Sequence, residues 1–146
     1  MATNPSTEAN TALIRRFFEE VFNQGNLAAV DELWIEGRAE SGKRATVALR
    51  TAFPDYHRTM DAQIAEGDTV VTRWTMRGTH QGPYESRVLG RTIPPTGRRV
   101  EVPGVSIHRV AGGRIVAGWT LGVNDSVELL QQLGALPAPG AAREVG

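Results

Sequence analysis

Cysteine is absent from this chain of 146 residues, which excludes disulfides, thiolate metal sites and a cysteine nucleophile. This absence fits a reducing compartment, so we expect a cytoplasmic protein. Net charge is absent too, because sixteen basic and sixteen acidic side chains cancel, leaving no electrostatic footprint for nucleic acid or an anionic membrane. No apolar run approaches the roughly twenty residues that a membrane span needs. These absences predict a soluble protein whose partner is neither nucleic acid nor membrane.

The length of the chain predicts one domain, because 146 residues suffice for one hydrophobic core and are few for two. We find no internal repeat and no linker, and therefore expect a single domain over residues 1–146. Residues 135–146 consist largely of Ala, Pro and Gly, which predicts a flexible tail. The first six residues lack the basic-then-apolar order of a signal peptide.

The first third of the chain has helical periodicity. Leu13, Phe17 and Val21 recur at intervals of four and predict a helix that runs from about residue 6 to about residue 23. Asn26 is placed to cap a short second helix. A third helix is expected from about Gly42 to Thr51, ahead of a proline.

The later part of the chain changes to a period of two, which is typical of strands. The expected strands cover residues 56–66, 69–79, 100–110 and 114–121, and residues 81–97 are expected to form a loop rich in Gly and Pro. A last short helix is expected up to Leu133, capped by Ser126 or Asp125. Helices followed by long strands predict an α+β domain.

Three short segments carry a resemblance to a known family. Residues 78–82 read Gly-Thr-His-Gln-Gly and are followed by Pro-Pro-Thr-Gly-Arg-Arg at 94–99; the segment from Trp119 to Asp125 leads into Leu-Leu-Gln-Gln-Leu-Gly. With the Phe-Pro-Asp turn at 53–55, they resemble the SnoaL-like polyketide cyclases of the NTF2-like superfamily. The resemblance implies a cone in which a curved, mostly antiparallel sheet and about three helices surround a central pocket. It also implies a homodimer, and chemistry that needs no metal and no cofactor.

The expected catalytic pattern of that family is altered here. Its cyclases use an Asp on the last strand and a His on the preceding strand, and these positions fall on Thr120 and Ser106. The His that often follows the second helix is also missing from residues 34–38. These substitutions disfavour a simple aldol mechanism and favour ring closure by confinement in an apolar pocket.

Three residues remain as catalytic candidates, namely His108, Asp125 and Thr120. His108 lies two residues beyond Ser106 and therefore on the same strand face, and an imidazole titrates near neutrality. Asp125 is either the cap of the last helix or a proton-transfer group, and both interpretations remain open.

Large apolar side chains that suit a flat polycyclic or polyene substrate provide the binding candidates, although core packing explains such residues equally well. Trp74 and Trp119 alternate with polar residues, so either of them could instead face a second subunit. His80 is expected mainly to fix a strand end or an interface. The candidate set for substrate binding is Phe22, Trp34, Phe53, Trp74, Met76, His80, Ser106 and Trp119.

Two arginines and the histidines are the remaining polar candidates for substrate or metal binding. Arg73 and Arg77 share one strand face, so they either polarise a substrate carbonyl inside the protein or are solvated outside it. The histidines and Asp125 lack the local spacing of a metal site, so no metal is expected.

The sequence thus favours a cofactor-free cyclase that closes a ring in a small, hydrophobic polyketide-type intermediate. The alternatives are a dehydratase or hydroxylase of polyketide tailoring, and a non-catalytic ligand-binding protein, because one fold can host several functions.

Overall fold

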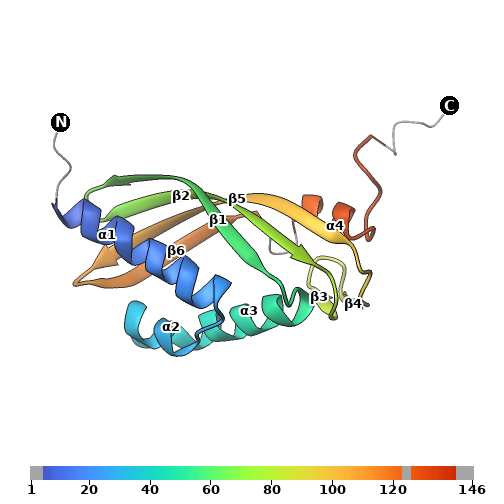
Figure 1. Ribbon diagram of the computed structural model, residues 1–146, viewed down its shortest axis with the longest axis horizontal. Helices are drawn as coiled ribbons and strands as arrows, with labels where there is room; N and C mark the ends of the chain where they lie inside the picture. Colours follow the sequence, from blue (N-terminus) through green and yellow to red (C-terminus); the bar gives the residue numbers. More distant parts are fainter. Residues whose placement is uncertain (1–4, 123–125, 141–146) are drawn as a thin grey trace.

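The computed structural model of the protein describes residues 5–122 and 126–140. In this part of the chain three α-helices and one π-helical segment come first, six strands follow and a short helix ends the domain (Figure 1). The helical elements are α1 (Pro5–Arg16), the π-helical segment η1 (Phe17–Asn23), α2 (Ala28–Leu33), α3 (Ala39–Ala52) and α4 (Val127–Gln132). The strands are β1 (His57–Glu66), β2 (Thr69–Thr79), β3 (Tyr84–Ser86), β4 (Arg91–Ile93), β5 (Arg99–Ala111) and β6 (Arg114–Leu121).

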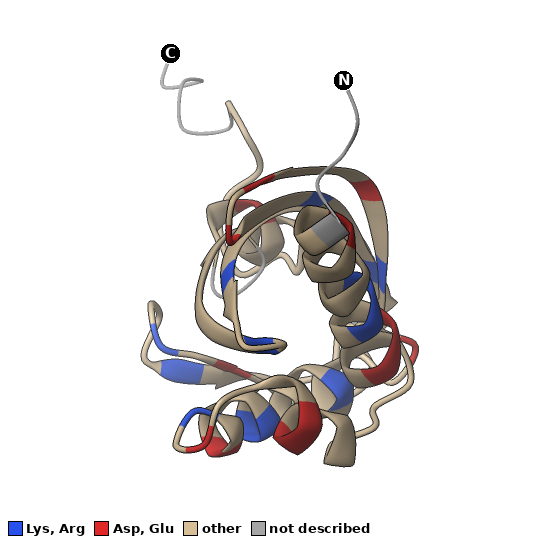
Figure 2. Cartoon of the chain, turned by 90° about the vertical axis from the view of Figure 1, so that its left-hand side faces the viewer, with Lys and Arg blue, Asp and Glu red and all other residues tan. Residues whose placement is uncertain are grey.

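The main sheet has the order β1-β2-β5-β6, and each neighbouring pair is antiparallel. A register shift between Met60 and Ala62 and another between Arg109 and Val110 interrupt its outer pairs. Such bulges bend a strand and increase its twist. Seen end-on in Figure 2, the strands curve into an arc that leaves one side open. The predicted α+β fold with a curved antiparallel sheet is therefore confirmed.

The hydrophobic core lies between the concave face of this sheet and the helices. Alternate residues of β2, including Val70, Trp74 and Met76, are fully buried, whereas Arg73 and Arg77 between them are exposed. Phe18 and Val21 of η1 are buried against the same side. The buried face of β2 thus packs against the apolar stripe of the first helical region, as the sequence predicts.

The first helix changes its winding where the sequence predicts one continuous helix. At its end the Gln24 N–H donates to the carbonyl of Glu19, five residues earlier, at 3.0 Å. The wider turn of a π-helix rotates the side chains that follow. The segment ends at Asn23, whose side chain binds strand β1. Helix α3 begins at Ala39, three residues before the predicted start.

The prediction of a plain loop over residues 81–97 is wrong in part. Within it, β3 and β4 form a small antiparallel hairpin in which Tyr84 pairs with Ile93. Tyr84, Ser86 and Ile93 are buried while Glu85 is exposed. The alternation of buried and exposed residues covers only three residues in each strand. It is therefore too short to recognise among the surrounding Gly and Pro residues.

The last helix has the predicted cap. The Ser126 hydroxyl accepts the Leu129 N–H at 3.1 Å, which selects Ser126 from the two predicted caps. Asp125 and residues 141–146 of the predicted tail lie outside the described residues. Within the described ranges, no helix combines the length and the apolar character needed to cross a bilayer.

Candidate functional site

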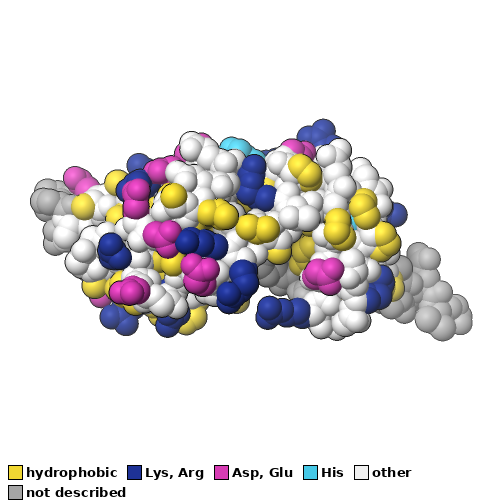
Figure 3. All heavy atoms as spheres, turned by 90° about the horizontal axis from the view of Figure 1, so that it is seen from below, with side chains coloured by type: hydrophobic (Ala, Val, Ile, Leu, Met, Phe, Trp, Pro, Cys, Tyr) yellow, Lys and Arg dark blue, Asp and Glu magenta, His cyan; other side chains and the backbone are white. Residues whose placement is uncertain are grey.

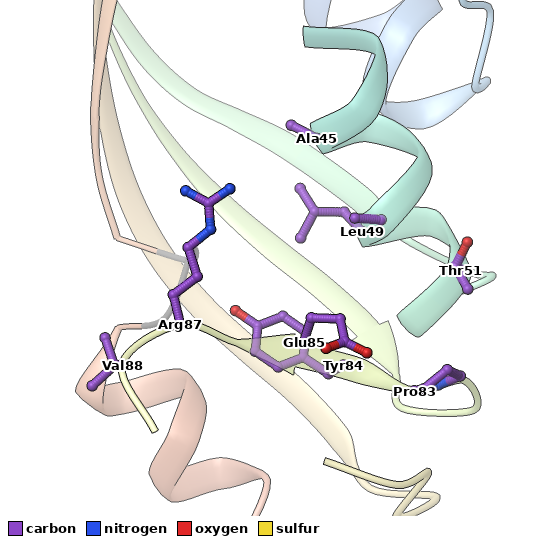
Figure 4. Close-up of a pocket in the computed structure, with 9 residues that line it drawn as sticks. Ala45, Leu49, Thr51, Pro83, Tyr84, Glu85, Arg87 and Val88 are labelled. Atoms are coloured by element: carbon purple, nitrogen blue, oxygen red, sulfur yellow. The ribbon is translucent and has the colours of Figure 1, made fainter. Parts of the chain in front are cut away.

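A pocket of about 660 Å³ opens between helix α3 and the segment that contains strand β3. This volume lies within the range typical of small-molecule sites. In Figure 4, Ala45 and Leu49 point from α3 toward the space, and Arg87 rises into it from beyond β3. Apolar side chains form most of the wall: Ala45, Ala48 and Leu49 from α3, and Pro83, Tyr84 and Val88 from the opposite side. The pocket can therefore hold an organic molecule with Arg87 and Glu85 as charged neighbours.

A second set of functional groups lies on the concave face of the sheet, where strand β1 buries an arginine. Arg58 is only 4% exposed, and its guanidinium carbon lies 3.8 Å from the ring centre of Phe22 and 4.0 Å from that of Trp74. Its Nε donates to the Tyr56 hydroxyl at 2.6 Å. Burial raises the pKa of Tyr56, and the Arg58 charge partly opposes that rise. The domain interior thus contains a cation among aromatic rings.

The end of η1 fixes the backbone of Arg58. The Asn23 side-chain oxygen accepts the Arg58 N–H at 2.7 Å, and the Asn23 amide nitrogen donates to the Arg58 carbonyl at 3.0 Å. Arg50 on α3 donates to the carbonyls of Phe22 and Asn23 at 2.8 and 3.1 Å. These bonds join η1, β1 and α3 around one point of the interior.

His108 is as buried as Arg58 and lies on strand β5. Its ring centre is 5.7 Å from that of Phe17, 6.3 Å from Phe18 and 6.0 Å from Trp34. Burial, followed by the charge of Arg58, lowers the pKa of His108 to about 4. The imidazole is therefore neutral at pH 7. Its Nδ1 atom and the Nε1 atom of Trp34 are buried without a hydrogen-bond partner among the described residues.

A chain of hydrogen bonds runs from the interior to the surface through the predicted catalytic position on β6. Trp74 Nε1 donates to the Ser106 hydroxyl at 2.9 Å, and the Ser106 and Thr120 hydroxyls lie 3.2 Å apart. Ser106 is fully buried whereas Thr120 is exposed. Since the two residues are direct partners across β5 and β6, Thr120 belongs to the concave side of the sheet.

His80 closes the end of strand β2. The Thr96 N–H donates to His80 Nδ1 at 3.2 Å, and backbone bonds of 2.8 Å join His80 to Arg98 and Gly97. Burial lowers the pKa of His80, and a backbone contact with Gly82 partly opposes that shift. The ring thereby holds the loop that carries the second half of the family motif.

The remaining sequence-predicted residues are divided between the core and the outer face. Phe53 and Met76 are fully buried, and Phe22 and Trp34 are partly exposed at the rim of the core. Trp119 lies on the outer face of the sheet and is 55% exposed. Arg77 is also on the outer face and pairs with Glu101.

The structure brings His108, Ser106, Thr120 and Trp74 together on the concave face. None of the eight predicted substrate-binding residues lines the 660 Å³ pocket. Sequence reasoning missed Arg58 and the walls of that pocket. For Arg58 a signal existed, because it alternates with Tyr56 at the start of a strand. The pocket walls carry no such signal, because Ala45 and Ala48 are ordinary helix residues and the hairpin opposite them was not predicted. In the part of the chain that the structure describes, no three His, Asp or Glu side chains gather closely enough to hold a metal ion.

Solved structures with the same fold cover almost the whole chain. A candidate SnoaL-like polyketide cyclase from Jannaschia Sp. CCS1 is 22% identical with a TM-score of 0.80, covering 94% of this chain and 99% of its own. AclR, a candidate hydroxylase from Streptomyces galilaeus, is 25% identical with a TM-score of 0.77, covering 94% of this chain and 88% of its own. IdmH, a candidate polyketide cyclase from Streptomyces antibioticus, is 32% identical with a TM-score of 0.66, covering 86% of this chain and 98% of its own.

Comparison with curated proteins finds no match. The sequence signature described as SnoaL-like polyketide cyclase matches residues 12–133, which include all four strands of the main sheet. The curved sheet, the helices on its concave side and the matched signature agree. The chain therefore belongs to the SnoaL-like polyketide cyclase family.

Proposed function

We propose that the protein closes a ring in a polyketide-type intermediate, without a cofactor, by confining a flexible chain in the pocket between α3 and β3. The observation that carries this proposal is the 660 Å³ pocket with its mostly apolar wall. Holding two reacting ends in a productive pose can lower a barrier by about 7–11 kcal/mol in favourable cases. Confinement can therefore supply much of the rate even where the family's strand Asp is replaced by Thr120.

His108 and Thr120 on the concave face do not line that pocket, so in this proposal they assist where the bound chain extends beyond it. A neutral His108 can accept a proton or orient a carbonyl, since its pKa of about 4 keeps the ring uncharged at pH 7. Thr120 can donate a hydrogen bond to substrate while its hydroxyl accepts one from Ser106, whose own oxygen accepts the Trp74 Nε1–H. Asp125 as a proton-transfer group remains a prediction.

A hydroxylase is the second candidate function, because a 25%-identical structure bears that description. The two reactions differ in the mass of the product. Ring closure leaves the mass unchanged, or lowers it by one water if dehydration follows, whereas hydroxylation adds one oxygen atom. Mass spectrometry of the product therefore distinguishes them directly.

The test fills the pocket from the α3 side. We expect Ala48→Phe to slow ring closure at least about tenfold, because one phenyl ring occupies space that the folded substrate needs. Cells that carry the variant gene should accumulate an acyclic intermediate, measured by chromatography with mass detection.

The matched control is Ala12→Phe, the same change at an exposed position of α1 outside this pocket. It should leave the cyclised product at the parental level. Parental ring closure by a folded Ala48→Phe variant would contradict confinement in this pocket.

A further inference from the structure

Arg58 is a buried cation that lacks an anionic partner. Among the described residues its guanidinium makes one hydrogen bond, from Nε to the Tyr56 hydroxyl, and no carboxylate lies within ion-pair distance. A guanidinium stays protonated at any accessible pH. Burying such a charge without a counter-ion is unfavourable. The terminal nitrogens of Arg58 are not among the fully buried polar atoms that lack a partner, so they retain some access to solvent and to a ligand.

The neighbours of Arg58 stabilise the cation only in part. The rings of Phe22 and Trp74 lie against its guanidinium, and Phe18 lies at 5.4 Å. Cation–π contacts of this kind stabilise a cation without neutralising its charge. Ring contacts use the faces of the guanidinium, whereas hydrogen bonds use its edge. The edge formed by the two terminal nitrogens is not bonded to any described residue.

A guanidinium edge has a defined preference among ligands. Its two parallel N–H groups match two coplanar oxygens that share one negative charge, as in a carboxylate or in the enolate of a 1,3-dicarbonyl unit. Phe22 is only partly exposed and covers the cation, so Arg58 lies one side chain beneath the surface on that side. We propose that Arg58 is a binding residue for such a planar, two-oxygen anion of the substrate.

The scaffold around Arg58 is rigid enough for this role. Asn23 holds its backbone through two hydrogen bonds, and Tyr56 fixes the inner end of the guanidinium. The charge also acts on the chamber around it, because it contributes to the lowered pKa of His108. An anion bound at Arg58 would therefore share one interior with a neutral imidazole.

This inference rests on the proposed function and deepens it, because a polyketide chain contains 1,3-dicarbonyl units. When a proton leaves the carbon between two carbonyls, the negative charge spreads over both oxygens. Arg58 would hold those two oxygens and thereby favour the ionised form. Arg58 does not line the pocket between α3 and β3, so the chain would have to reach from that pocket to the concave face for Arg58 to hold one of its ends.

The test measures binding and ionisation of small probes rather than turnover. Acetylacetone represents the 1,3-dicarbonyl unit and benzoate represents the carboxylate, and calorimetry gives the affinity for each. We expect Arg58→Met to weaken the preferred probe at least about tenfold, because hydrogen bonds to a charged group are lost. In parallel, the ultraviolet spectrum of bound acetylacetone should show the enolate at a lower pH in the parent than in Arg58→Met.

The controls separate charge, shape and folding. Arg77→Met removes the same charge from the outer face and should bind both probes as the parent does. Arg58→Lys keeps the charge without the planar edge and should bind more weakly than the parent but ionise acetylacetone more readily than Arg58→Met. Circular dichroism checks that each variant is folded.

The two probes also identify the source of the anion, since the stronger binder shows whether a carboxylate or an enolate is held. If neither probe shows binding that depends on Arg58, the inference is overturned. That result leaves the pocket-filling test of ring closure untouched, so the two failures can be told apart.

Discussion

At the scale of single residues, His108 couples the chemistry of the interior to the stability of the fold. Its pKa is about 4 in the folded protein against an ordinary 6.5, so the folded state binds this proton less readily than the unfolded chain. The contribution of the neutral imidazole to the free energy of unfolding is fully present above about pH 6.5. It is lost progressively as the pH falls from 6.5 toward 4, because only the unfolded chain then takes up the proton.

This linkage predicts a pH-dependent difference between variants. From about pH 7 to about pH 4.5, His108 should account for a loss of roughly 2.5 kcal/mol in the free energy of unfolding. His108→Phe should remove that part of the loss and flatten the pH dependence. Urea unfolding at the two pH values measures it, and His57→Phe, at an exposed position of β1, should keep the parental loss. Equal pH dependence in parent and His108→Phe would refute the buried neutral state.

The sequence locates some of these residues and not others, for a physical reason. The two-residue period of a strand places Ser106 and His108 on one face, so local pattern alone brings them together. Arg58 obeys the same period, but a charged residue at a strand position is ordinarily solvated. What buries it are Phe22 and Trp74, which are 36 and 16 positions away and meet it only after the sheet has curved.

At the scale of elements, the close approach of Trp74 to strand β5 shapes the concave face. A methyl group built on Gly104 would lie 2.2 Å from the Trp74 ring, far inside van der Waals contact. The ring therefore lies directly on the backbone of β5, from where its Nε1 reaches Ser106. A glycine here is a packing requirement of the site rather than a flexible point.

Substitution by alanine at two different glycines should then change the free energy of unfolding in opposite directions. Gly104→Ala should lower the free energy of unfolding by about 1–3 kcal/mol or more, because overpacking displaces the Trp74 ring. Gly42→Ala, within α3 and at an ordinary 3.6 Å from Val30, should raise it by up to about 1 kcal/mol through helix propensity. Thermal unfolding measures both, and a stabilised Gly104→Ala variant would show that the ring has room to move.

Elements differ in how far the sequence could predict them. The four long strands and the cap at Ser126 follow from patterns that span several residues. The π-helical winding of η1 does not follow from such a pattern; the segment ends at Asn23, which bonds to Arg58, far along the chain. The hairpin of β3 and β4 was missed because three-residue strands contain too little alternation to detect. The 660 Å³ pocket depends on that hairpin, so the sequence could not locate its wall.

At the scale of the whole molecule, charge is distributed evenly while apolar surface is not. The face shown in Figure 3 carries acidic and basic side chains interspersed with one another. The outer face of the main sheet has a different character. Strand register places Ile64, Val71, Ile107 and Trp119 side by side, in a row that crosses all four strands. Ile64 is 72% and Trp119 is 55% exposed, so the row is presented to solvent.

An exposed apolar row of this kind is typical of a surface that a partner covers. We predict that a second copy of this chain covers it, because a sheet face can pack on its own two-fold equivalent without any further component. Trp119→Glu would place a charge at the β6 end of that row and should convert a dimer into a monomer, measured by light scattering at micromolar concentration. Val47→Glu introduces the same charge at an exposed apolar position of α3 and should leave the dimer intact. A parent protein that is already monomeric at this concentration, or a Trp119→Glu variant that stays dimeric, would exclude this face as the interface.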